Sequence, residues 1–185
     1  MSLRHKKHSR NRVLPKIWLM TDPRFGNDLL RAIQRLPFGS GVIFRHYNIE
    51  IRARRTLFSD VRKICRRRGH MLLMASDPRT VMAWGADGVH GQLLRTTPLI
   101  HSVSVHDIRE IARARRCDAD ITLLSPVFAT KSHPGSRPLG ALRFMLLARL
   151  CGNAKVIALG GMTGRKSKML DPRIIHGWAA IGAFR

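Results

Sequence analysis

Residues 70–90 read HMLLMASDPRTVMAWGADGVH, and a short apolar segment stands at each end of this stretch. Residues 70–75 and 87–90 have the length and composition of buried strands. Between them, Asp77-Pro78 is typical of a helix start, because aspartate caps the first turn and proline suits the first helical position. The stretch therefore predicts a strand, a helix and a second strand in succession.

The same alternation extends over most of the chain. Six further aliphatic or β-branched segments have the character of strands: residues 16–20, 41–47, 99–105, 120–128, 154–160 and 177–182. Most intervening segments place apolar side chains at helical spacing, as Leu57, Val61 and Ile64 do. Four arginines around that segment are expected to lie away from its apolar stripe: Arg54, Arg55, Arg62 and Arg66.

Eight predicted strands in 185 residues leave about 23 residues for each repeat, enough for a strand, a short helix and two turns. We therefore predict an α/β fold, a compact (β/α)8 TIM barrel. The alternative is an open doubly wound sheet, whose usual strand number, about six, leaves two segments unexplained.

The domain boundaries follow from the same pattern. Residues 1–15 form a basic N-terminal arm, and residues 16–185 are expected to form a single barrel domain. Because the chain stops soon after the last strand, we expect the final outer helix of the barrel to be missing. The flank near the first strand would then be exposed, or covered by the arm or by a second subunit in a homodimer.

Composition excludes several classes of protein. The hydrophobic fraction of 44% is enough for a buried core, so the chain is not disordered despite its formal charge of +23. The longest apolar run, residues 71–75, is far too short to cross a membrane. Cys65, Cys117 and Cys151 are widely separated, and we interpret them as reduced, structural residues of a cytoplasmic protein.

The basic residues have three competing explanations. Arginine accounts for 26 of the 34 cations, with local runs in the N-terminal arm and at residues 66–68. Such a surface can bind nucleic acid non-specifically by counterion release, or it can simply be a solvated, arginine-rich surface. A few cations can also serve phosphorylated small molecules. With 6% aromatic residues and no zinc-finger spacing, nothing in the sequence supports recognition of specific bases.

The barrel prediction restricts where chemistry can occur, because active sites of such barrels lie at the carboxyl ends of the strands. The polar residues in those positions, strand by strand, are Thr21, Asp22, Arg45, Ser76, Asp77, His90, Gln92, Ser104, His106, Ser125, Thr130, Lys131, Ser132, His133, Gly160 and Gly161.

The paired glycines end the seventh predicted strand. Gly160-Gly161, with Ile181-Gly182 beside them on the eighth, are typical of the amide-lined phosphate cup of such barrels. The alternative for the pair is a tight turn that requires positive φ.

Two histidines and one aspartate are candidates for catalysis or metal binding. A histidine such as His106 at the mouth of the barrel can transfer a proton near neutral pH, or it can satisfy backbone groups at a helix start. For His90 we favour a packed histidine inside the barrel mouth. Asp77 can hold Mg²⁺ or cap the helix beginning at Pro78, and we prefer the cap because the sequence offers no second carboxylate nearby.

Taken in order, seven motifs resemble the thiamine phosphate synthase/TenI family from about residue 16 to the C-terminus: LMTDP at 19–23, FR at 44–45, SD at 76–77, DGVHGQ at 87–92, SVH at 104–106, PVFAT at 126–130 and ALGG at 158–161. That family is a (β/α)8 barrel of thiamine biosynthesis. The resemblance implies one of two activities. The synthase joins hydroxymethylpyrimidine diphosphate to thiazole phosphate and releases pyrophosphate with Mg²⁺, whereas TenI aromatises a thiazole carboxylate phosphate by tautomerisation without a metal.

The resemblance also implies roles for individual residues. It makes Arg45 a phosphate contact, Asp77 a Mg²⁺ ligand if the chain is synthase-like, and His106 the catalytic histidine of a TenI-like tautomerase. Residues expected to contact substrate are Ser76, His90, Gln92, Ser104, Thr130, Ser132, His133, Gly160, Gly161, Ile181 and Gly182. No cofactor is implied for the tautomerase.

The chain departs from the synthase pattern on the diphosphate side. Ile43 and Tyr47 replace a glutamine and a lysine, Ser76 replaces an asparagine, and His133 replaces the pyrophosphate-binding lysine. A second metal aspartate is also lacking. Because diphosphate departure needs cations, these changes favour the tautomerase, with the synthase as the alternative activity and a degenerate, cationic binding protein for nucleic acid or protein as the third hypothesis.

Overall fold

The computed structural model describes residues 13–130, 135 and 137–184. Most of the predicted basic arm, residues 1–12, lies outside the described residues, as do the predicted site residues Lys131, Ser132 and His133.

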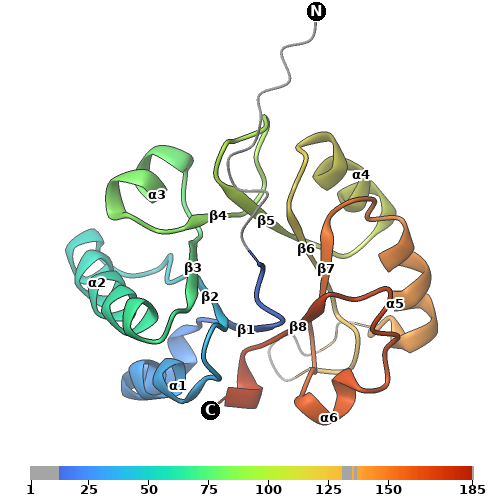
Figure 1. Cartoon of the computed structure of the whole chain (residues 1–185), viewed down its shortest axis with the longest axis horizontal. Helices are drawn as coiled ribbons and strands as arrows, with labels where there is room; N and C mark the ends of the chain where they lie inside the picture. The colour runs from blue at the N-terminus through green and yellow to red at the C-terminus, as the bar shows by residue number, and fades with distance from the viewer. Residues whose placement is uncertain (1–12, 131–134, 136, 185) are drawn as a thin grey trace, which may run out of the picture.

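Eight parallel strands close into a barrel in sequence order, with β8 pairing to β1 (Figure 1). Their bounds are β1 Ile17–Met20, β2 Gly41–Phe44, β3 Met71–Met74, β4 Gly88–His90, β5 Ile100–Val105, β6 Ile121–Leu124, β7 Lys155–Ala158 and β8 Gly177–Ala180. Each lies within one of the eight predicted segments, so the predicted TIM barrel is confirmed, and the open sheet is excluded by the β1–β8 pairing.

The outer layer consists of helices that follow most of the strands. They are α1 Leu29–Arg35, α2 Ile51–Arg67, α3 Pro78–Trp84, α4 Ile108–Arg116, α5 Gly140–Arg149 and the single turn α6 Gly164–Ser167, with 3-10 segments η1 Pro23–Asp28 and η2 Gly182–Phe184. No helix joins β4 to β5 through residues 91–99, and among the described residues only η2 follows β8. The outer ring is therefore open between α3 and α4 and between α6 and α1 (Figure 1).

The barrel core depends on matched large and small side chains. Trp18 of β1 pairs in register with Gly41 of β2, and a Cβ atom at Gly41 would collide with the Trp18 ring. The Trp18 indole N–H donates to the Pro15 carbonyl at 2.7 Å, so the one polar atom of this buried ring is satisfied. Glycine on the neighbouring strand therefore makes room for the largest residue of the core.

One expectation about α2 was wrong. Arg54 was expected on the outer surface, but its side chain is 8% exposed and packs inward. It precedes Phe58 and Val61 by four and seven residues, a spacing that places it on the buried face of the helix. Its guanidinium donates to the Ala75 carbonyl at 2.8 Å and lies 5.5 Å from the centroid of the Trp84 ring. By contrast, Arg55 and Arg66 are exposed as expected, and Arg62 is half-buried.

The three cysteines carry free thiols. Burial raises the pKa of Cys65 to about 12 and that of Cys151 to about 11, as expected for thiols that pack as small apolar groups. In the described part of the chain, no helix has both the length and the apolarity that crossing a bilayer requires.

Candidate active site

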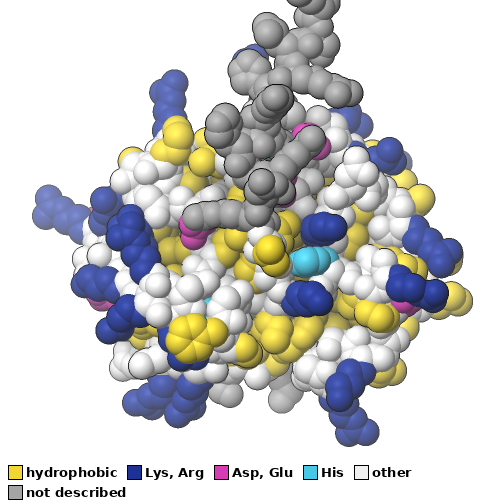
Figure 2. All heavy atoms as spheres, viewed as in Figure 1, with side chains coloured by type: hydrophobic (Ala, Val, Ile, Leu, Met, Phe, Trp, Pro, Cys, Tyr) yellow, Lys and Arg dark blue, Asp and Glu magenta, His cyan; other side chains and the backbone are white. Residues whose placement is uncertain are grey.

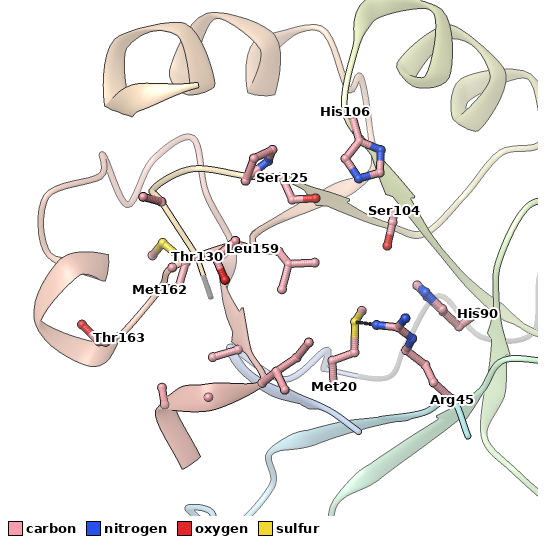
Figure 3. A pocket seen from close by; sticks show the side chains of 18 of the residues that line it. Met20, Arg45, His90, Ser104, His106, Ser125, Thr130, Leu159, Met162 and Thr163 are labelled. Carbon is pink, nitrogen blue, oxygen red and sulfur yellow. Dashed lines mark hydrogen bonds between the residues drawn. The ribbon is translucent and has the colours of Figure 1, made fainter. Parts of the chain in front are cut away.

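A cavity of about 680 Å³ opens at the carboxyl ends of the strands. Along one side Figure 3 shows Arg45, His90, Ser104 and His106, and across from them Thr130, Leu159 and Met162. Strands β1, β2, β4, β5, β6, β7 and β8 or the loops after them all supply lining residues. The cavity therefore occupies the end of the barrel at which the sequence predicted the chemistry.

Most of the predicted site residues that the structure describes meet in this cavity. Nine of them line it: Arg45, His90, Ser104, His106, Thr130, Gly160, Gly161, Ile181 and Gly182. Ser76, Asp77 and Gln92 do not line it. Lining residues that were not predicted to contact a ligand include Met20, Pro126, Leu159 and Thr163. The first three stand inside motifs quoted for the family resemblance, but they are apolar and were given no role.

Arg45 is held in place by the end of β1. Its backbone N–H donates to the Thr21 hydroxyl at 2.9 Å, and its guanidinium lies 3.0 Å from the Met20 sulfur. The same guanidinium lies 5.9 Å from the centroid of the Tyr47 ring. A half-buried cation in contact with soft and aromatic groups keeps donors available for an anionic ligand.

His90 is a buried, neutral histidine. Its Nδ1 lies 2.9 Å from the Ser102 hydroxyl, and that hydroxyl donates to the Val89 carbonyl, so Nδ1 carries the proton and donates to Ser102. The pKa of His90 is lowered to about 3. Desolvation is the largest cause, and the charges of Arg45 and His101 add to it. At neutral pH its Nε2 is therefore an acceptor and not a cation, as the packed-histidine interpretation requires.

His106 has a carboxylate partner that the sequence analysis missed. Its Nδ1 lies 2.8 Å from Glu110 Oε2, which also accepts the His106 backbone N–H at 2.7 Å. The cap of α4 is Asp107, whose carboxylate accepts from the Glu110 backbone, so His106 is not the capping residue. Since Nδ1–H points at a carboxylate, Nε2 is the atom left for a ligand. A glutamate four residues after the strand-end histidine was the sequence signal for this pair.

The turn after β7 requires glycine at two successive positions. Gly160 and Gly161 have φ values of 92° and 63°, a region that L side chains rarely adopt. A Cβ atom at Gly160 would lie 2.7 Å from the Pro126 Cα atom, closer than real contacts allow. The prediction of a tight turn with positive φ is therefore confirmed. Both glycines also line the cavity.

Hydrogen bonds fix the direction of the peptides in this turn. The Leu159 and Gly160 carbonyls accept from the backbone N–H groups of Val127 and Phe128 at 2.9 and 3.1 Å. Lys166 Nζ donates to the Gly161 carbonyl at 3.1 Å. In a trans peptide the N–H points opposite to the C=O, so the N–H groups of the two glycines turn away from residues 127–128. Among the backbone hydrogen bonds of turns and loops in the described residues, none has the Gly160 or Gly161 N–H group as its donor.

Asp77 acts as the cap of α3. One carboxylate oxygen accepts the backbone N–H groups of Arg79 and Thr80, both at 3.0 Å, and the other accepts the Thr80 hydroxyl. These bonds, the Thr80 hydroxyl foremost, lower the pKa of the Asp77 carboxyl. The described residues contain no group of three or more histidine, cysteine or acidic side chains that could hold a metal ion. Asp77 is therefore a helix cap, and the Mg²⁺ role that the resemblance implies for it stays a prediction.

Together, the fold and the cavity define the class of this protein: a (β/α)8 barrel with a cavity at the carboxyl ends of its strands. A family model described as thiamine monophosphate synthase matches residues 18–184, and the chain belongs to this thiamine phosphate synthase/TenI family.

Individual relatives agree with that assignment. The chain is 28% identical over 183 residues to "Putative thiamine-phosphate synthase 2" of Aquifex aeolicus, covering 92% of this chain and 98% of the relative. It is 31% identical over 114 residues to "Thiamine-phosphate synthase" of Methanoregula boonei, covering 56% and 53%. The solved structure of a thiamine phosphate pyrophosphorylase from Pyrococcus furiosus superposes with a TM-score of 0.74 at 20% identity, covering 91% of this chain and 86% of that one. This structural likeness supports the fold alone.

Proposed function

We propose that the protein binds a thiazole phosphate in this cavity and acts as a TenI-like tautomerase in the cytoplasm. The observation that carries the proposal is the His106–Glu110 pair at the cavity mouth, with Nδ1 and Oε2 2.8 Å apart. A histidine whose Nδ1–H is held by a carboxylate presents Nε2 as a proton acceptor, and the carboxylate stabilises the imidazolium that forms.

The reaction needs one group that both accepts and returns a proton. His106 Nε2 removes a proton from one position of the non-aromatic thiazole ring and delivers a proton to another, which leaves the ring aromatic. Atoms and electrons balance without a metal or cofactor, because tautomerisation only relocates a proton and double bonds. Glu110 holds the imidazole through both steps.

Two parts of the cavity suit the anionic groups of such a substrate. The glycine turn at 160–161 offers backbone N–H groups to the phosphate, with Lys166 bonded behind it. Arg45 supplies a cation on the other side of the cavity, where a ring carboxylate would be accepted (Figure 3). Ser104 and Thr130 line the space between these ends.

The second candidate is a thiamine phosphate synthase, which the names of the relatives favour. It requires stabilisation of a departing pyrophosphate, for which Mg²⁺ and several cations are the usual means. Tyr47 stands in this cavity where the synthase pattern has lysine, and Asp77 is engaged as a helix cap outside it. The residues that line the cavity therefore supply more of the groups that a tautomerase needs than of those that a synthase needs.

Calorimetric titration and a product assay test the two candidates. We expect thiazole carboxylate phosphate to bind without Mg²⁺, and Arg45→Ala and Gly160→Ala to weaken that binding. With both synthase substrates and Mg²⁺, we expect little or no thiamine phosphate. Turnover at an ordinary enzymatic rate, about 1 per second or more, would establish the synthase instead. If neither thiazole phosphate nor thiazole carboxylate phosphate binds, both candidates are removed.

A further inference from the structure

A cationic surface surrounds an exposed aromatic ring at the opposite end of the barrel. The loop after α1 meets the end of α2, where Gly39 N–H donates to the Arg68 carbonyl at 3.2 Å. The Arg68 guanidinium donates to the Leu36 carbonyl at 2.7 Å and lies 3.9 Å from the centroid of the Phe38 ring. Phe38 is nevertheless 71% exposed. We call Arg35, Phe38, Arg66, Arg67 and Arg68 the Phe38 patch.

The charges of this patch are not neutralised locally. Arg35, Arg66 and Arg67 are exposed, and within the described residues none of them takes part in an ion pair. A helix dipole favours a cation in the last turn, but α2 ends in two arginines and Arg68 follows directly. Figure 2 shows Lys and Arg side chains gathered at the lower left, over the place of α1 in Figure 1.

Acidic residues lie at both ends of the barrel, with the larger share at the cavity end. Six of the eleven lie at helix N-termini, beside the carboxyl ends of the strands: Asp22, Asp28, Glu50, Asp77, Asp107 and Glu110. The Phe38 patch lies where helices end and strands begin. Four acidic residues also precede strands at this end, Asp87, Asp118, Asp120 and Asp171, but none of them forms an ion pair with an arginine of the patch among the described residues.

We infer that the Phe38 patch binds single-stranded nucleic acid, with phosphates on Arg35, Arg66 and Arg67 and a base stacked on Phe38. Guanidinium groups bind phosphate oxygens in pairs, and an exposed aromatic ring stacks any unpaired base. Arg68 covers one face of the ring and fixes its orientation, which leaves the other face for the base. An acidic protein would use the charges but has no need of the ring. The proposal is independent of the chemistry in the cavity.

Fluorescence anisotropy with the full chain and a labelled oligothymidine of about 20 nucleotides tests this inference. Arg66→Glu/Arg67→Glu should weaken binding by about tenfold or more at low salt. The matched control is Arg109→Glu/Arg143→Glu, which makes the same change in net charge at exposed residues of α4 and α5. The control should weaken binding by less than about threefold, since it changes only the distant field.

The ring is tested separately from the charge. Phe38→Ala should weaken single-strand binding by about fivefold and leave duplex binding unchanged, while Phe38→Leu serves if the alanine variant does not fold. If the two charge-reversal variants lose affinity equally, binding depends on the overall charge of the protein, and the proposed site at the Phe38 patch is wrong. Unchanged binding in both Phe38 variants would overturn base stacking. Displacement of the oligonucleotide by poly-glutamate at matched charge would assign the surface to acidic proteins instead.

Discussion

The two ends of the barrel use arginine differently. At the cavity end, Arg45 and Arg54 are half-buried or buried, and backbone or side-chain contacts hold each in one place. At the opposite end, Arg35, Arg66 and Arg67 are exposed and outside any ion pair of the described residues. The contrast shows that burial and fixed partners, and not residue type, separate an arginine held in one place from a surface charge.

Replacing His106 by Asn should have the largest effect, because it removes catalysis at the cavity end and leaves nucleic-acid binding at the opposite end unchanged. Asparagine keeps much of the shape and hydrogen bonding but cannot transfer a proton. Tautomerisation should fall by about 10²- to 10⁴-fold, while affinity for thiazole phosphate and for oligothymidine changes little. Single-turnover kinetics measures the rate, and titration measures both affinities. A rate within about threefold of the wild type would make His106 structural and transfer attention to His90 and His133.

The stability of the cavity end should depend on pH through His90. The pKa of His90 is about 3 in the folded protein, against 6.5 as the ordinary value, so below pH 6.5 only the unfolded chain takes up this proton. Stability therefore falls as pH drops from 6.5 toward 3, and from pH 7 to 5 this one group should cost about 2 kcal/mol. Urea denaturation of His90→Gln should show a correspondingly smaller loss. If the stability of the variant depends on pH as that of the wild type does, His90 is not a buried neutral histidine.

Arg54 should contribute to stability through its hydrogen bond to the Ala75 carbonyl. Arg54→Met keeps an apolar stem but leaves the Ala75 carbonyl without its donor, so unfolding free energy should fall by about 2 kcal/mol. The neighbouring Arg55 is the matched control, because it is exposed and lies 4.8 Å from the Trp84 ring centroid. Arg55→Met should cost about 0.5 kcal/mol. Urea denaturation of both variants measures their free energies of unfolding. Equal losses in the two variants would contradict a stabilising role for the buried Arg54 contact.

The smallest effect should come from removing residues 1–12. This segment carries five cations, Arg4, Lys6, Lys7, Arg10 and Arg12. Its deletion should weaken oligothymidine binding by about threefold and reduce the slope of log affinity against log salt by at least about one unit. Thiazole chemistry should be unaffected. Binding that survives about 0.2 M salt and selects particular sequences would contradict a purely electrostatic contribution.

The barrel was predictable because its signals are local and repeated. Each strand of a parallel barrel is buried on both faces, so it appears in the sequence as a short aliphatic run, and helices with one apolar face separate most of these runs. The position of the site followed from topology, which brings strand ends together. That reasoning placed nine of the predicted residues in one cavity, including His106 and Gly160.

The sequence by itself determined where the strands lie along the chain, the glycine turn at 160–161 and the cap at Asp77, since each depends on neighbouring residues. Only the tertiary structure decided which polar groups are buried and paired. The spacing of Arg54 to Phe58 and Val61 marks the buried face of α2, but only the fold supplied its partner, the Ala75 carbonyl just after β3. The neutrality of His90 arises from desolvation together with Arg45 and His101. Exposure of Phe38 beside Arg68 depends likewise on how α1 ends against α2. Burial is a sum over elements distant in sequence, so a local pattern can indicate a buried face but not the partners that a side chain meets there.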